Sequence, residues 1–162
     1  NLYTKTMKDK TMTMLRDNFK AKSNNSENNN QNICAQAVAR ALGASDGSVR
    51  YLHCIDDIVR AARMTGFQVR SRKSNLKKNS TVGAARKIIQ KLAAKENENE
   101  IFCVAQPVAY IVRVAGHALL MDNDGNTIVD TDPRKADRRK ITHFYAVTRM
   151  EDINRKEFHM SI

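Results

Sequence analysis

One cysteine and one histidine of this chain could act together in nucleophilic chemistry. Cys34 lies at the start of an apolar helical segment, residues 33–42, and a helix N-terminus favours the reactive thiolate through its partial positive charge. The base must come from elsewhere, because a partner within the same short helix would leave no space for substrate. His117 is the best candidate, since Gly116 lets the chain approach closely and an apolar strand follows. The pair predicts attack of a sulfur on a carbonyl carbon.

A third group is needed to orient the imidazole and fix its tautomer. The segment Asp122-Asn123-Asp124-Gly125 is a strong hairpin signal, and the turn that it forms decides which carboxylate faces the histidine. A four-residue loop places His117 opposite Asp130, whereas a two-residue turn slips the register and places it opposite Asp132. We favour Asp130 and leave Asp132 open.

An oxyanion donor should lie a few residues before the nucleophile, where side-chain amides are available. The candidates, among which the sequence does not choose, are Asn28, Asn30 and Gln31. A zinc site that combines the cysteines at 34, 54 and 103 with His117 lacks the close-spaced ligand pair of structural sites. The acidic turn at 122–125 lacks the downstream glutamate of a calcium loop. We expect no metal and no cofactor.

The elements that would position these residues follow from hydrophobic periodicity. Spacings of three and four predict helices over residues 33–42, 49–65 and from Ser80 or Thr81 to Lys95. Short β-branched and aromatic runs predict strands at 67–70, 101–104, 108–114, 117–121, 127–130 and 141–148. Helices first and a hairpin-rich sheet afterwards predict an α+β fold in which N-terminal helices pack on a C-terminal antiparallel sheet of four or five strands.

The length and composition predict one domain with loose ends, because 162 residues with 41% hydrophobic content can build a single core. We expect a basic arm and polar linker at 1–32, the domain at 33–150 and a tail at 151–162. Three cysteines without a CxxC pair, and no leader signal, predict reduced thiols and an intracellular protein that is not secreted. No apolar run approaches the length of a membrane span.

Positive charge is the strongest compositional feature, with 28 Lys plus Arg against 17 Asp plus Glu and a net charge of +11. Such a field favours an acidic protein partner or nucleic acid. The excess gathers between residues 60 and 95, in Arg60, Arg63, Arg70, Arg72, Lys73, Lys77, Lys78, Arg86, Lys87, Lys91 and Lys95, and again in Arg134, Lys135, Arg138, Arg139 and Lys140. A solvated surface explains these charges equally well, because no nucleic-acid recognition motif accompanies them.

The order of these features resembles the papain-like cysteine peptidase superfamily. The chain has Cys34 within NICAQAVARAL, then His117 within AGHALLM, then Asp130 or Asp132 within TIVDTDP, and the likeness covers roughly residues 28–148. It is closest to small papain-fold proteins of bacteriophages and to bacteriocin leader peptidases. The resemblance implies a thiol peptidase or acyl-transfer hydrolase that acts on a polypeptide in the cytoplasm of a bacterial host or in association with a virion. The alternative is a papain-fold protein without catalysis that binds nucleic acid or an acidic host or virion partner. The oligomeric state is open.

Overall fold

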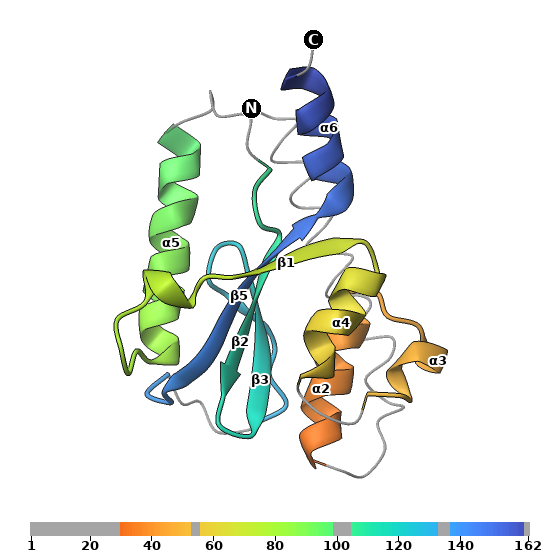
Figure 1. Ribbon diagram of the computed structural model, residues 1–162. Coiled ribbons are helices and arrows are strands. Elements are labelled where there is room, and N and C mark those ends of the chain that lie inside the picture. Colours follow the sequence, from red (N-terminus) through yellow and green to blue (C-terminus); the bar gives the residue numbers. More distant parts are fainter. Residues whose placement is uncertain (1–29, 53–55, 99–104, 133–136, 161–162) are drawn as a thin grey trace.

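A five-stranded antiparallel sheet forms the centre of the protein, with strand order β1-β5-β2-β3-β4 (Figure 1). The computed structural model describes residues 30–52, 56–98, 105–132 and 137–160, and the side chains within 33–52, 56–95, 105–132 and 137–155. The strands are β1 Phe67–Ser71, β2 Ala109–Val114, β3 His117–Asp122, β4 Thr127–Val129 and β5 Ile141–Arg149. The predicted α+β class with an antiparallel sheet is confirmed. The predicted strand at 101–104 lies outside the described residues.

Helices cover both faces of the sheet, as Figure 1 shows. On one side lie α2 (Asn30–Ala41), α3 (Asp46–Val49) and α4 (Asp57–Met64), and on the other lies α5 (Val82–Glu98). Alternation along β2 supplies both cores, because Ile111 packs with α2 and α4 whereas Val112 packs with α5. The expectation that the helices simply precede the sheet needs one correction: β1 comes from the N-terminal half and pairs with β5, so α5 lies between two strands of the sheet in the sequence.

Helix α2 is buried on every side along its C-terminal half. Every residue from Cys34 to Leu42 is buried, including Gln36 and Arg40, because alanine alternates through the segment and lets neighbours approach closely. One side of the helix packs on the sheet, and Ala39 belongs to a second cluster with α3 and α4. Gly43, with φ of 96°, ends the helix through hydrogen bonds of the Schellman type. Periodicity alone would bury one face of this helix, whereas the structure buries all of its faces from Cys34 to Leu42.

Several predicted boundaries were wrong. The helix expected over 49–65 is shorter: α4 covers Asp57–Met64, and the separate one-turn helix α3 (Asp46–Val49) ends where the predicted helix was to begin. The predicted tail is the helix α6 (Met150–Met160), which follows β5 directly. The helix expected over 33–42 is α2, which begins at Asn30, within the segment predicted to be a linker. Residues 1–29, which include most of the predicted basic arm and linker, lie outside the described part of the chain.

Helix α5 begins where the sequence predicted. The Thr81 hydroxyl accepts a hydrogen bond from the Ala84 amide at 3.3 Å, so Thr81 rather than Ser80 caps the first turn. The hairpin between β3 and β4 packs against this helix: the Arg86 guanidinium donates to the Gly125 carbonyl and, at 3.1 Å, to the Thr127 hydroxyl. No helix in the described segments is both long and apolar enough to cross a membrane.

Candidate active site

The structure brings His117 and Asp130 into direct contact beside helix α2. His117 Nε2 lies 2.7 Å from Asp130 Oδ1, and the two side chains are 13% and 20% exposed. His117 is the first residue of β3, and it follows the two-residue turn that closes the β2–β3 hairpin. Asp130 is the residue after β4. Because β3 and β4 are neighbours in the sheet, the pairing of these strands sets the distance between imidazole and carboxylate.

Cys34 completes the group from the helical layer. Its side chain lies close enough to that of His117 to dominate the pKa of the imidazole, and because Nε2 contacts Asp130, Nδ1 is the ring nitrogen left for the sulfur. The hydrogen bond with Cys34, and more weakly that with Asp130, raises the pKa of His117 above its ordinary value of 6.5 against the opposing effect of burial. The arrangement therefore stabilises the imidazolium form of His117 beside the sulfur.

Asp130 is held by more than the imidazole. Its Oδ1 also accepts from the Asp132 amide at 3.0 Å, and its Oδ2 accepts from Arg139 at 3.2 Å. The same guanidinium donates to Asp132 Oδ2 at 3.3 Å. Asp132, the alternative third residue, donates its backbone amide to Asp130 and shares Arg139 with it. Sequence reasoning assigned Arg139 to a polyanion-binding surface and missed this role, because no periodic pattern links it to the two aspartates.

The register argument that favoured Asp130 was wrong in detail. Met121 pairs with Thr127 instead of Asn126, and an irregularity between Leu120 and Met121 then shifts the pairing of Leu120 to Val129. Asp122 Oδ1 accepts from the backbone amides of two turn residues, which fixes this wider turn. The paired strand ends before Asp130, so its side chain turns to His117 outside the ladder. Neither of the two simple hairpin registers describes the strand pair.

The helix N-terminus also differs from the expectation. Since α2 begins at Asn30, Cys34 lies in its second turn, where the field of the helix end is weaker than in the first turn. The neighbouring imidazole is therefore the main local source of positive charge for the sulfur. Of the three oxyanion candidates, Asn28 lies outside the described residues, and Asn30 and Gln31 lie in the first turn of α2 with side chains outside the description.

Gly116 has a different purpose from the one expected. A Cβ at this position would meet no atom within 4 Å, so close approach is not the reason for glycine. Its φ of 68° lies in the left-handed region, which the turn before His117 requires. Glycine therefore allows the tight β2–β3 turn that places the histidine at the strand end.

The structure describes only some of the remaining cysteine and histidine side chains. Cys54, Cys103 and His53 lie outside the described residues, as does the side chain of His159 in α6. His143 lies exposed on β5, stacked on Tyr145 with ring centroids 5.9 Å apart. Burial, together with the charges of Arg113 and Lys73, lowers its pKa. Within the described part of the chain, no cluster of residues has the composition of a metal site.

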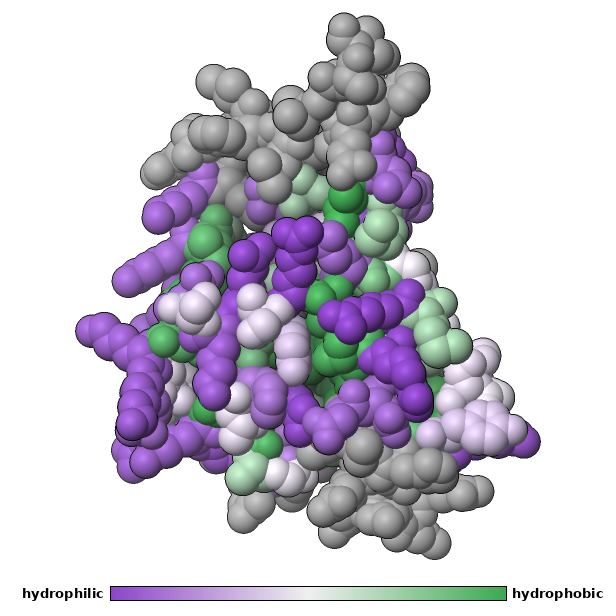
Figure 2. All heavy atoms as spheres, in the orientation of Figure 1, coloured by the Kyte–Doolittle hydropathy of each residue, from purple (hydrophilic) through white to green (hydrophobic). Residues whose placement is uncertain are grey.

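The predicted basic surface divides into two classes. Among its described arginines, four have protein partners: Arg60 pairs with Asp57, Arg63 donates to the Val69 carbonyl, Arg86 pairs with Asp137, and Arg139 binds the two aspartates beside His117. The remaining described members are exposed, namely Arg70, Arg72, Lys73, Lys77, Lys78, Lys87, Lys91, Lys95, Arg138 and Lys140. Figure 2 shows hydrophilic side chains projecting from the left of the view, over α5 and the 3-10 turn η2 (Lys73–Asn75).

Comparison with protein-family models, curated proteins and solved structures gave no match to this chain.

Proposed function

We propose that this protein is a papain-like cysteine peptidase or a related thiol acyl-transfer hydrolase that acts on a polypeptide. Cys34 is the nucleophile, His117 the base, and Asp130 the residue that orients the ring. The observation that carries the proposal is that His117 contacts Asp130 at 2.7 Å while the Cys34 side chain is the largest influence on the pKa of the same imidazole. A nucleophile, a base and an orienting group that contact one another in this order carry out acyl transfer in several unrelated folds.

The reaction proceeds in two proton-balanced halves. The thiol proton moves to His117 Nδ1 as the sulfur attacks the substrate carbonyl carbon, the C–N bond breaks, and His117 returns the proton to the departing amine. Water then attacks the thioester while His117 accepts its proton, and the carboxylic product leaves as the thiol is restored. Asp130 stabilises the imidazolium that forms in each half, and it keeps Nδ1 directed at the sulfur.

The order of elements supports the papain-like assignment. The nucleophile comes from a helix that precedes the sheet, and the base and the carboxylate come from two adjacent strands later in the chain. Cys34 is 0% exposed, so a substrate carbonyl reaches the sulfur only when the atoms that cover it move aside. Substrate binding and this movement are therefore linked, and an enzyme of this kind would react more slowly than an open thiol site.

The test uses p-nitrophenyl acetate as an activated acyl donor at neutral pH, with nitrophenolate release followed by absorbance and the thioester located by mass spectrometry. We expect the parent protein to be acetylated at Cys34 and the Cys34→Ala variant to lose this modification. His117→Gln should be acylated at least tenfold more slowly than the parent. General-base catalysis contributes about 10² to 10⁴ in rate, and we expect a smaller contribution here because the ester is intrinsically reactive.

His143→Gln is the matched control, because His143 is an exposed histidine on the same sheet with the pKa shifted in the opposite direction. It should keep the parent rate. If His117→Gln acylates Cys34 as fast as the parent, the sulfur reacts as an ordinary thiol and the proposal fails.

A further inference from the structure

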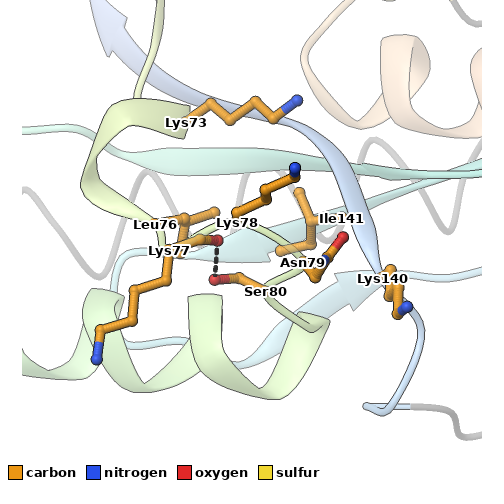
Figure 3. Close-up of a pocket in the computed structure, with 8 residues that line it drawn as sticks. All are labelled: Lys73, Leu76, Lys77, Lys78, Asn79, Ser80, Lys140 and Ile141. Carbon is orange, nitrogen blue, oxygen red and sulfur yellow. Dashed lines mark hydrogen bonds between the residues drawn. The ribbon is translucent and has the colours of Figure 1, made fainter.

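A second polar site lies away from the Cys34 group, in the loop that joins β1 to α5. Its pocket has a volume of about 260 Å³ and is lined by η2, the residues that follow it, and the start of β5 (Figure 3). Leu76 forms part of its wall and packs on the core between the sheet and α5, whereas Cys34 belongs to the core on the opposite face. The sheet therefore separates the two sites.

The lining of this pocket is strongly cationic. Among the described residues that line it, none carries a carboxylate, and four are lysines: Lys73, Lys77, Lys78 and Lys140. None of the ion pairs between described residues includes any of these four. In Figure 3 Lys77 extends away to the lower left, Lys73 lies above the other lining residues, and Lys78 and Lys140 lie on either side of Asn79. Like charges brought together without a counter-charge repel, and a bound anion would relieve that repulsion.

The loop that carries these lysines is held in place by hydrogen bonds. The Ser80 hydroxyl donates to the Lys77 carbonyl at 2.5 Å, and the Ser80 carbonyl accepts from the Ile141 amide at 2.8 Å. At the other end, the Arg72 amide donates to the Phe144 carbonyl at 2.7 Å. Asn79 adopts a φ of 63°, a left-handed conformation that asparagine tolerates better than most residues. Both ends of the loop are thus fastened to β5, which reduces the entropy lost when a ligand binds.

The chemistry of the lining selects the ligand. Lysines supply compact positive charges with three donors each, and the Asn79 amide supplies further donors, whereas none of the described lining residues is an aromatic on which a base could stack. The volume lies just below the roughly 300 to 1,000 Å³ range of pockets that enclose a whole small molecule. A single tetrahedral anion with its ester substituent directed to solvent fits both features.

We propose that this pocket, formed by residues 73–80 and 140–141, binds a phosphate group. The phosphate can belong to the backbone of a nucleic acid strand or to a small phosphorylated molecule, since both present the same anionic oxygens. The site does not depend on the thiol chemistry proposed for Cys34.

The experiment measures binding of two probes to the full-length protein over a range of salt concentrations. One probe is a fluorescein-labelled single-stranded oligonucleotide followed by fluorescence polarisation, and the other is inorganic phosphate followed by calorimetry. The pocket variant is Lys73→Gln/Lys78→Gln/Lys140→Gln. Its matched control is Lys87→Gln/Lys91→Gln/Lys95→Gln, which removes the same charge from exposed positions on α5.

We expect the pocket variant to bind the oligonucleotide about 100-fold more weakly than the parent at about 0.1 M salt, because three lost phosphate contacts at a slope of about −0.7 each remove about two powers of ten relative to 1 M salt. The α5 control should also bind the oligonucleotide more weakly, but by less than about a third of this effect on a logarithmic scale. If the pocket variant also weakens the binding of inorganic phosphate, and the parent binds the oligonucleotide no more tightly than phosphate, the ligand is a small phosphorylated molecule. If the parent binds neither probe, or if the two triple variants weaken binding equally, the pocket is no phosphate site.

Discussion

Replacing Asp130 by asparagine tests whether the carboxylate beside His117 assists the reaction of Cys34. The substitution keeps the size of the side chain but removes its charge. Asp130 Oδ1 accepts from His117 Nε2 at 2.7 Å, which is a short distance for a nitrogen–oxygen hydrogen bond and is typical of a charged pair. An asparagine amide at this position offers a neutral oxygen or an NH₂ group, and the latter cannot accept the proton on Nε2. The imidazolium would lose stabilisation, and the ring would lose its fixed orientation.

The size of the effect follows from the environment of the pair. Hydrogen bonds to charged groups contribute about 1.5 to 3 kcal/mol. With side chains 13% and 20% exposed, His117 and Asp130 are shielded enough from water for that range to apply. At about 1.36 kcal/mol per tenfold change in rate, the second-order rate constant for acylation of Cys34 should fall by about 10-fold to 160-fold.

The assay is stopped-flow acylation by p-nitrophenyl acetate at neutral pH, with peptide mapping to assign the thioester to Cys34. Asp132→Asn is the matched control, because it removes the same charge from a residue bound to the same Arg139. It should keep the parent rate constant within about a factor of two, the range that corresponds to ±0.5 kcal/mol for substitutions away from a critical contact.

Two results would refute the reasoning. An unchanged rate constant in Asp130→Asn would mean that the hydrogen bond at Nε2 does not assist the chemistry. Equal losses in Asp130→Asn and Asp132→Asn would mean that the two carboxylates act together through Arg139 as a structural unit. In that case the orienting role could not be assigned to Asp130.

Two further predictions concern stability. The raised pKa of His117 contributes stability that is fully present below pH 6.5 and is lost as the pH rises through the higher folded-state value. In urea titrations, the unfolding free energy of the parent minus that of His117→Gln should therefore be larger at about pH 5.5 than at about pH 9. A difference that rises with pH would contradict the assignment. Gly125→Ala should destabilise the protein by about 1 to 3 kcal/mol, because its φ is +84° and a Cβ would lie 3.1 Å from the Arg86 carbonyl oxygen. Gly47→Ala is the control, because its Cβ would lie 4.0 Å from the nearest neighbouring side chain, and its unfolding midpoint should not fall.

Much of the fold could be predicted from the sequence because its signals are local. Periodicity gave α5 and the strands β1 to β5, and Gly43 marked the end of α2, since these patterns depend on neighbours within one or two turns of chain. The pairing of Cys34 with His117 was also predictable, from the order of a cysteine in a helix and a histidine that opens a strand. The helix expected over 49–65 was predicted to start too early, because the apolar spacing runs on from Val49, where α3 ends, to Asp57, where α4 begins.

The sequence by itself determined the α+β architecture, the net positive charge and the two residues most suited to thiol chemistry. Tertiary structure decided the rest: which aspartate reaches the imidazole, how Arg139 holds both aspartates, that Cys34 lies a turn inside its helix, and which lysines share a pocket. The physical reason is that these features depend on an irregular strand pair and on loops fastened to distant elements, and a shift of one residue in such pairing changes which side chains meet.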